Sequence, residues 1–402
     1  MSTPKKDIAV IGAGITGTTA ALMLAERGHQ VHLIDKASNV MTGASLINEG
    51  KIHLGFVYVN DPSLRSLDVM VDTAVVFRSI LERWIPPQVF EEAVTDTFDY
   101  IVPSDSLVSP EEIERKFALI AQKIEAAEDR HKTQYLGKER SAIWKKKSSV
   151  DEAFQDDYIV ANYQTMERSI DTHLIAAALE SCIDQEDRIE LNLNQPISRI
   201  RNQGTKWRLE MGEKSFGPFD HIVNASWDGR PQLDEQVFGP DPVSWYHRYK
   251  HALILQAHGD ISIPNFTAII GTYGDVIKYP SGRVYLSHYP AGMLSASDQI
   301  EQVQTIYSQE TKEAIAHNTI DGLSQFVPSI HDVFAGCQVS GDDVAGGIIM
   351  ARGTTDIDDR ESELHQRYKI GIQEQNGYMS IDTGKYTCGP AMAEEAVQQI
   401  LN

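Results

Sequence analysis

The sequence contains few cysteines, and this scarcity argues against two kinds of stabilising site. The 402 residues include only three, Cys182, Cys337 and Cys388, which lie far apart along the chain. They form neither a CxxC pair nor the spacing of zinc ligands, so we predict no disulfide framework and no metal site. We expect all three to behave as small hydrophobic side chains.

Long apolar runs and an excess of basic charge are also missing. No apolar stretch reaches the length that spans a bilayer, and residues 1–6 lead into a strand without the apolar core of a signal peptide. We therefore expect a cytoplasmic protein with no integral membrane segment. The formal net charge of −21 opposes binding to nucleic acid or to an anionic membrane surface. Basic groups at a site for an anionic ligand must then be placed locally.

The composition that is present is typical of a globular protein, with 42% hydrophobic and 23% charged residues. A chain of this length is too long for one compact core, so we expect two domains. Strand-like and helix-like patterns occur along the whole chain, which predicts an α/β fold, α+β overall.

The first motif is a strand, a glycine-rich turn and a helix. Residues 7–11 (DIAVI) form a short β-branched run, residues 12–17 (GAGITG) follow, and apolar residues at 20–25 give a helical pattern. A second strand is expected at 31–35. This order predicts a Rossmann βαβ unit, which binds a dinucleotide. The alternative is a βαβ turn that binds nothing.

Each glycine of this turn has a separate task. Gly12 allows the tight turn, Gly14 lets a pyrophosphate approach the backbone, and Gly17 lets the helix pack closely on the strands. The N-terminus of the helix offers unpaired N–H groups and a partial positive charge to the phosphates. Asp35, at the end of the second strand, is placed to accept hydrogen bonds from an adenosine ribose.

The rest of the chain decides between FAD and a nicotinamide cofactor. A nicotinamide dehydrogenase normally continues with further βα repeats, whereas residues 41–61 are rich in Gly, Ser and Asn and can wrap a cofactor. Residues 380–396 (SIDTGKYTCGPAMAEEA) indicate a strand, a glycine turn and a helix, with Gly389 as the cap and Pro390 at the first helical position. Lys385 in this turn would stabilise the negative charge of a reduced flavin; a loop lysine in solvent is the alternative.

Several of these segments resemble the D-amino-acid oxidase family of FAD-dependent oxidoreductases, nearest its glycerol-3-phosphate and 2-hydroxyglutarate dehydrogenase branches. The family has a Ser- or Asn-containing loop before an IHxG element, here residues 52–55 (IHLG). Residues 167–179 resemble its acid-x-x-Ile-Asp helix entry, with Asp171 as the N-cap. Residues 196–227 resemble its strand, hairpin and return strand, and residues 384–387 (GKYT) its closing motif.

The chain departs from the family at one point. The return strand usually ends in Ala-Gly or Thr-Gly, where this chain has Ala225 and Ser226. This difference puts the local backbone geometry in question, not the cofactor.

The resemblance implies that FAD is the cofactor and that both domains are discontinuous. A Rossmann-like FAD-binding domain is expected from residues 1–60, 158–232 and 340–402, and a mixed sheet-and-helix substrate domain from 61–157 and 233–339. The motif and the resemblance together assign the cofactor contacts to Gly12, Gly14, Ile15, Thr16, Gly17, Asp35, Lys36, Thr42, Gly43, Ala44, Ser45, Asn48, Ile197, Ala225, Gly384, Lys385, Tyr386 and Thr387.

The inserted segments have secondary-structure patterns of their own. Apolar spacing predicts helices at 63–84, 110–127 and 299–317, and β-rich runs predict strands at 249–257, 268–273 and 284–288.

His53 and Lys51 are the ionisable candidates for chemistry in the N-terminal third. His53 is interpreted as a general base that takes the substrate O–H or N–H proton while hydride leaves carbon. A histidine that only bonds backbone is an equal alternative, and covalent attachment of FAD is a third. Lys51, on the same strand face, would bind a substrate carboxylate or promote reaction with oxygen; a surface lysine is the alternative.

Substrate contacts are expected from later segments. Arg352 is placed to hold a carboxylate or phosphate in a bidentate fork, although the acids at Asp356, Asp358 and Asp359 offer it structural partners instead. The turn at 280–282 brings together further candidates, of which strand alternation lets only some face a pocket. These candidates are Tyr279, Arg283 and His288.

The resulting hypothesis is an FAD-dependent dehydrogenase or oxidase that acts on a CH–OH or CH–NH carbon of a small hydroxy acid, polyol or amino acid. The electron acceptor is oxygen, a quinone or a protein. One alternative is a flavin hydroxylase that uses NAD(P)H, but its late Gly-Asp-Ala motif is missing. Another is a non-catalytic FAD-binding subunit of a larger assembly.

Overall fold

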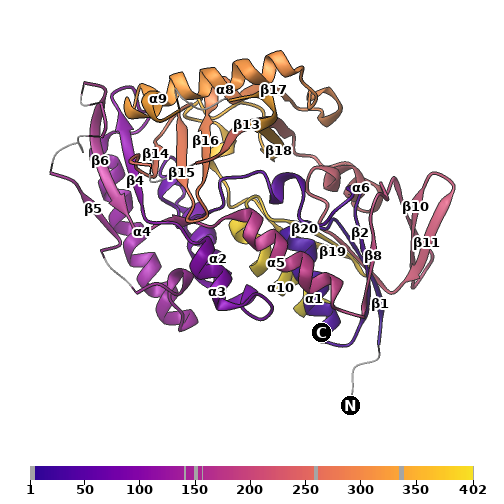
Figure 1. Ribbon diagram of the computed structural model, residues 1–402. Helices are drawn as coiled ribbons and strands as arrows, with labels where there is room; N and C mark the ends of the chain where they lie inside the picture. The colour runs from indigo at the N-terminus through magenta and orange to yellow at the C-terminus, as the bar shows by residue number, and fades with distance from the viewer. Residues whose placement is uncertain are drawn as a thin grey trace.

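The structure is a computed structural model that describes residues 5–139, 142–148, 153–155, 157–257, 261–334 and 339–401; Cys337 lies outside them. Two large sheets dominate it (Figure 1). A six-stranded sheet lies at one end of the molecule with three helices beside it, and a nine-stranded sheet lies at the other. The α/β, α+β overall, fold class is therefore confirmed.

The six-stranded sheet is parallel except for one edge strand. Its order is β19 (Gly371–Gln375), β20 (Tyr378–Asp382), β12 (His221–Asn224), β1 (Asp7–Ile11), β2 (Gln30–Ile34) and β8 (Ile189–Asn192). The helices beside it are α1 (Ile15–Glu26), α5 (Thr172–Asp184) and α10 (Gly389–Leu401).

The central strand β1 is buried on both faces, which explains its continuous apolar run. Ile8 and Val10 pack in the cluster that contains the apolar face of α1. Ala9 and Ile11 pack instead against a three-stranded sheet and α6. That sheet consists of β9 (Arg199–Asn202), β10 (Trp207–Met211) and β11 (Lys214–Phe219), and α6 spans Arg230–Phe238.

The nine-stranded sheet is mixed and draws on segments from most of the chain. Its order is β17 (Met293–Ser297), β13 (Trp245–Gln256), β16 (Arg283–His288), β15 (Gly274–Lys278), β14 (Phe266–Ala268), β4 (Phe98–Pro103), β6 (Ile159–Thr165) and β5 (Trp144–Lys146), and β18 (Val344–Arg352) pairs with β13 as well. A two-stranded sheet of β3 (Lys51–Ile52) and β7 (Arg168–Ser169) lies apart from it.

Helices pack along the nine-stranded sheet, and further helices lie next to it. The helices α8 (Gln309–Ser324) and α9 (Ser329–Phe334) run along one side of it (Figure 1), where Ile315 and Leu323 pack on Leu253 and Leu286. The others are α2 (Arg65–Leu81), α3 (Pro87–Ala93), α4 (Pro110–His131) and the short α7 (Tyr289–Gly292).

Most expected elements are present, with three corrections. Asp171 caps α5 as predicted, because its side chain accepts from the backbone N–H of His173 at 3.0 Å. The strand expected at 268–273 ends at Ala268, and the apolar residues after it form a buried loop. The helix expected from residue 299 begins at 309, where the Ser308 side chain caps it.

The third correction concerns the last helix. It begins at Gly389, directly after a short 3-10 turn at Tyr386–Cys388, so Gly389 is a helical residue and Pro390 is the second one rather than the first. A Cβ on Gly389 would lie 2.9 Å from Cγ2 of Ile15, so close packing against α1 accounts for the glycine.

The division into two domains stays a prediction. Two strands from segments assigned to the cofactor domain, β6 and β18, pair with β4 and β13 in the nine-stranded sheet.

Candidate active site

The turn between β1 and α1 requires glycine for reasons of space. Gly12 has φ +100°, and a Cβ there would lie 2.4 Å from the carbonyl oxygen of Ala225. A Cβ on Gly14 would lie 2.6 Å from Oγ of Ser45, and one on Gly17 only 1.8 Å from the Gly12 carbonyl oxygen. The space at all three positions therefore admits no Cβ unless a neighbouring atom shifts, while the pyrophosphate contact of Gly14 stays a prediction.

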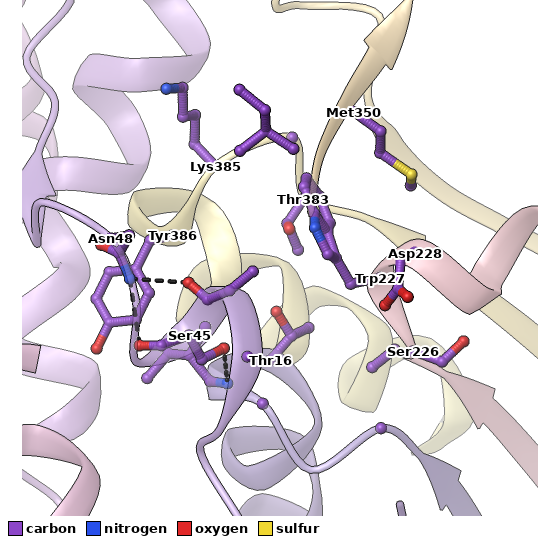
Figure 2. Close-up of a pocket in the computed structure, with 18 of the residues that line it drawn as sticks. Thr16, Ser45, Asn48, Ser226, Trp227, Asp228, Met350, Thr383, Lys385 and Tyr386 are labelled. Carbon is purple, nitrogen blue, oxygen red and sulfur yellow. Dashed lines mark hydrogen bonds between the residues drawn. The ribbon is translucent and has the colours of Figure 1, made fainter. Parts of the chain in front are cut away.

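A long cavity lies at this turn, over the N-terminus of α1 (Figure 2). In Figure 2, Lys385 lies at one end of it and Ser226 at the other. Its walls contain most of the residues predicted to contact the cofactor: Gly12, Gly14, Ile15, Thr16, Asp35, Lys36, Thr42, Gly43, Ala44, Ser45, Asn48, Ala225, Gly384, Lys385 and Tyr386. Segments far apart in the sequence are thus assembled around one helix N-terminus, where N–H groups have no intrahelical partner.

Three predicted cofactor residues lie elsewhere. Gly17 packs inside the βαβ unit. Ile197 lines an adjoining cavity that shares Gly12 and Asp35 with the first. Thr387 is fully buried and supports the site from behind, because its hydroxyl accepts from the N–H of His53 at 3.0 Å.

The loops around this cavity are held by their own polar side chains. The Asp35 carboxylate accepts from the backbone N–H groups of Ala13 at 2.6 Å and Ala37 at 2.8 Å. A carboxylate has further lone pairs, so Asp35 can also accept from a ribose hydroxyl. Ser45 Oγ accepts from the N–H of Ile15 at 3.0 Å, and the Asn48 amide donates to the Ala44 carbonyl at 2.9 Å (Figure 2).

The departure at Ser226 does not disturb the backbone. Ser226 has φ −80°, an ordinary value for any residue, so glycine is not required there. The unusual conformation falls on the next residue: Trp227 has φ +52°, lines the cavity and donates its indole N–H to the Ile348 carbonyl at 2.8 Å. Trp227 is a cavity residue that the sequence did not predict.

A second, smaller cavity of about 170 Å³ adjoins the first. It is bounded by β13, β15 and by the loops that follow β14 and β18. Both cavities share a short set of residues: Glu49, Lys51, His53, Ile349, Arg367 and Lys385. Five of these six are ionisable, so the junction between the cavities is where chemistry can be expected.

The His53 imidazole lies between two carboxylates. Its Nε2 is 3.6 Å from Glu49, at the junction, and its Nδ1 is 3.6 Å from Glu167. Glu167 is fully buried and is held by the N–H of Leu54 at 2.6 Å and by the hydroxyl of Tyr100. Nδ1 is buried and forms no hydrogen bond among the described residues, so Glu167 acts on it through charge, while Nε2 lies on the side of the junction.

Lys51 is buried, with a side chain only 1% exposed, so the surface alternative does not apply to it. Its ammonium group donates to Asp275 at 2.8 Å and to the hydroxyl of Thr267, and it lies 4.9 Å from the centre of the Phe98 ring. Burial alone would raise the pKa of Asp275, but the charges of Lys51 and Lys250 lower it. The lysine is thus already paired with an acid.

Charge at the junction is predominantly positive. Burial lowers the pKa of Lys385 to about 8, although the charge of Glu49 opposes this shift. Burial also opposes ionisation of Glu49, but its hydrogen bond with His53 and the charges of Lys250 and Lys385 keep its pKa well below the usual range. At neutral pH Glu49 is an anion and Lys385 is mainly a cation.

Two arginines in the second cavity were not predicted. Arg248 is 2% exposed and donates to the Tyr289 hydroxyl and to Asp356, both at 2.9 Å. Burial raises the pKa of Tyr289, so its hydroxyl stays protonated. Arg367 lines both cavities, and its Nε is buried without a hydrogen-bond partner among the described residues. Burial and the charge of Arg248 lower the pKa of Arg367 to about 10.

The predicted arginine, Arg352, lines neither cavity. Its guanidinium lies over the ring of Trp245, 4.8 Å from the ring centre, and 3.6 Å from Asp241. The three acids expected as its partners do not pair with it in the described part of the chain; Asp356 binds Arg248 instead. Arg352 is the last residue of β18 and pairs with Trp245 of β13, and its side chain lies over that ring rather than at the cavities.

The other predicted substrate residues also lie outside the second cavity. Arg283 donates to Asp171 at 2.7 Å, and Tyr279 donates to the Glu49 carbonyl at 3.0 Å. The ring of His288 lies against Gly322 of α8, on the outer face of the sheet. Arg283, Tyr285 and Ser287 fall on one face of β16 and His288 falls on the other, and Ser287 is the one of these four that lines the cavity.

One signal for the missed arginine was available. In a strand, Arg248 and Lys250 fall on the same face, opposite His247 and Tyr249. Two cations on one face of an otherwise apolar strand suggest a functional surface, but the predicted strand began at 249 and left Arg248 out. No comparable pattern marks Arg367, which lies in an irregular segment.

Neither a membrane span nor a metal centre is found in the described residues. Within the described ranges, no helix is both long and apolar enough to pass through a bilayer. In the same ranges, no group of three or more His, Cys, Asp or Glu side chains is arranged to hold a metal ion.

Comparison with known proteins assigns the family. Residues 7–366 match the model of the DAO family, described as FAD dependent oxidoreductase. A D-amino acid dehydrogenase of Neisseria meningitidis is 41% identical over 49 residues, and this match spans 12% of either chain. The alignment with that curated relative thus covers only a small part of its length.

Solved structures resemble the whole fold. A glycine oxidase from Geobacillus kaustophilus superposes with a TM-score of 0.65 at 15% identity, covering 99% of this chain and 95% of that one. An L-alpha-glycerophosphate oxidase from Mycoplasma pneumoniae with FAD bound superposes with a TM-score of 0.66 at 13% identity, covering 98% and 94%. Together with the cavity at the βαβ turn, the family match shows that the chain belongs to the DAO family of FAD dependent oxidoreductases and that its cofactor is FAD.

Proposed function

We propose that this protein dehydrogenates a CH–OH or CH–NH carbon of a small anionic substrate, such as a hydroxy acid, an amino acid or a glycerophosphate-like compound. The observation that carries the proposal is the junction of the two cavities, where one set of ionisable residues faces both. When bound, FAD supplies the hydride acceptor at its N5 atom.

The cofactor contacts follow from the first cavity. The N-terminus of α1 and the backbone around Gly14 hold the pyrophosphate, because a side chain at this position would fill the space beside Ser45. Asp35 binds the ribose, and Ile197 packs against the adenine in the adjoining cavity. Lys385 and the turn that precedes it lie at the opposite end.

His53 accepts the proton that leaves the substrate oxygen or nitrogen. Its Nε2 lies on the side of the junction, and Glu167 at Nδ1 stabilises the imidazolium that forms. The hydroxyl of Thr387 fixes the His53 backbone, so the ring has a supported position. The alternative role, a histidine that only bonds backbone, does not account for the two carboxylates beside the ring.

The positive side chains bind the anionic group of the substrate. Arg367 lines the junction and has a free Nε among the described residues, and Arg248 in the cavity wall also has a buried Nε without a partner among them. Two proteins of similar fold are named a glycine oxidase and a glycerophosphate oxidase, whose substrates are both small anionic or zwitterionic molecules. A volume of about 170 Å³ lies below the range of drug-sized ligand pockets and suits a molecule of this size.

Anaerobic mixing of the FAD-loaded protein with hydroxy acids, amino acids and glycerol 3-phosphate tests the proposal. Loss of the flavin absorbance band with at least one of them is the expected result. No bleaching across the whole series would favour a non-catalytic FAD-binding subunit. Adding oxygen, a quinone or a protein acceptor to the reduced protein then identifies the electron acceptor by the return of the band.

A further inference from the structure

The turn that follows β12 places a tryptophan where the backbone favours glycine. Trp227 has φ +52°, a value that is rare for a residue with a large side chain and that strains the folded backbone. Glycine adopts this conformation without steric conflict, yet the chain has an indole at this position. Backbone strain of this kind persists only where the surrounding structure holds it, and it is frequent at ligand sites.

A buried asparagine holds this turn in place. Asn224 is fully buried, and its amide oxygen accepts from the N–H of Ser226 at 3.2 Å and from the Ser226 hydroxyl at 2.6 Å. The amide nitrogen of the same side chain donates to Asp234 at 3.0 Å and to the hydroxyl of Tyr378 at 2.8 Å. Both ends of the amide are thus fixed, and the backbone that leads into Trp227 is fixed with them.

The indole joins the segment after β12, in the six-stranded sheet, to β18, in the nine-stranded sheet. Its N–H donates to the carbonyl of Ile348 at 2.8 Å. Among the described strands, β18 pairs only with β13, so backbone groups along its other edge have no strand partner. Trp227 satisfies one of them. The bond fixes the indole beside the first cavity, whose wall includes Ile349 and Met350 of the same strand.

The position of the indole suits a contact with a long ligand. Trp227 is half-buried and lines the first cavity. Figure 2 shows it between Lys385, at one end of the cavity, and Ser226, at the other. An indole is large and mainly apolar, so covering its exposed part removes apolar surface from water. A ligand that runs along the cavity would gain this contact, and the contact would offset the strain in the backbone.

We propose that Trp227 is a binding residue for FAD: its indole packs against the part of the cofactor that joins the adenosine to the flavin ring. The hydrogen bond to Ile348 holds the indole at this place. The cofactor contact explains why a tryptophan rather than a glycine occupies a position with positive φ. This role concerns FAD alone, so it is independent of the substrate and of the proposed proton transfer.

Trp227→Gly tests the proposal, because this substitution removes the indole and the backbone strain together. The FAD-loaded protein is diluted, and the rise in free-flavin fluorescence measures the rate of cofactor release. We expect release about 10- to 100-fold faster than in the parent protein, the usual effect of deleting a large aromatic contact. A release rate equal to that of the parent would overturn the proposal.

Melting temperatures distinguish a cofactor contact from a purely structural role. The full-length protein is measured with excess FAD and after removal of FAD. A ligand that binds the folded protein stabilises it less when its Kd rises, so the variant should melt below the parent mainly in the presence of FAD. The same deficit with and without FAD, or a Trp227→Gly protein that does not fold, would assign Trp227 to the fold and contradict the proposal.

Two further variants separate the ring from the backbone. Trp227→Phe keeps an aromatic ring at the same position but lacks the N–H donor, so its release rate should lie between those of the parent and Trp227→Gly. Release as fast as in Trp227→Gly would contradict the ring contact. Lys132→Gly is the matched control, because Lys132 also has a positive φ, +53°, but is exposed at the end of α4 and lines neither cavity. It should release FAD at the parental rate; faster release would attribute the effect to the new glycine instead of the lost indole.

Discussion

The two cavities are built by different means. The cavity over α1 is formed mainly by backbone: glycines that admit no side chain, a helix N-terminus, and loops tied down by Asp35, Ser45 and Asn48. The second cavity is lined by apolar and charged side chains, and the charged ones come from strands and loops distant in sequence. A backbone site depends on local conformation, whereas a charged site depends on which distant elements meet. Substitutions should therefore affect the two cavities in different ways.

The largest effect is expected from Gly14→Val in the backbone site. A Cβ there would lie 2.6 Å from Oγ of Ser45, so the branched side chain would occupy the space for the pyrophosphate. Overpacking of about 3 kcal/mol corresponds to about 100-fold weaker FAD binding. The purified variant should lack the yellow flavin absorbance.

Gly28→Asn is the control for this substitution. Gly28 has φ +86°, a Cβ there would meet no described atom within 4 Å, and asparagine tolerates a positive φ better than other residues. The control should keep its FAD. A Gly14→Val protein with a full complement of FAD would remove the pyrophosphate assignment.

The second prediction concerns a substitution that should impair catalysis at the junction but leave FAD binding at the backbone site intact. His53→Ala should retain FAD and slow substrate-dependent flavin reduction by about 10²- to 10⁴-fold, the usual contribution of a general base. Stopped-flow absorbance measures both the FAD content and the rate. His317→Ala, at an exposed position of α8, should change neither. An unchanged rate in His53→Ala would exclude His53 from proton transfer.

The third prediction concerns pH. The cationic form of Lys385 binds the substrate anion, and burial lowers its pKa to about 8. Affinity for an anionic ligand should thus be full below this pH and fall by up to about tenfold for each unit above it. The groups around it are Glu49, Arg367, Lys250 and Lys51. Ligand titrations at several pH values measure the profile.

The variant Lys385→Arg distinguishes the titration of Lys385 from the titration of the groups around it. An arginine does not lose its proton in this pH range, so the fall in affinity should disappear or move to higher pH. A profile that stays the same in Lys385→Arg would assign the titration to another group.

The smallest effect on activity is expected at a residue that the sequence assigned to the substrate. Arg283 donates to the buried Asp171 at 2.7 Å and lies outside the second cavity. Arg283→Gln should lower the free energy of unfolding by about 1–3 kcal/mol, because a buried carboxylate loses a charged donor. Substrate affinity should remain near that of the parent protein, and a large loss of affinity without loss of stability would place Arg283 in the site after all.

The sequence brought together most of the residues that line the backbone site because its signals are local. A glycine spacing, a strand before it and a helix after it determine the conformation of one short segment, and the loop and turn that complete the cavity resemble a known family. The backbone geometry that the sequence left in question at Ser226 is ordinary, and the positive φ falls on Trp227.

The charged site could be predicted only in part. His53 and Lys51 lie directly after the glycine-rich loop, and both line the junction. Arg352 was expected there because of its place in the chain, but it lies at the end of β18 with its guanidinium over the ring of Trp245. Arg248, from β13, and Arg367, from an irregular segment, line the cavity instead.

The sequence alone determined that this chain forms a βαβ dinucleotide site, because close approaches at Gly12, Gly14 and Gly17 are consequences of local backbone geometry. Only the tertiary structure decided which cations surround the second cavity. The direction of a side chain depends on the exact register of its strand, and a shift of one residue moves it to the other face. The pairing of Arg248 with Asp356, and the free Nε of Arg367 among the described residues, follow from contacts between segments that are far apart in the sequence.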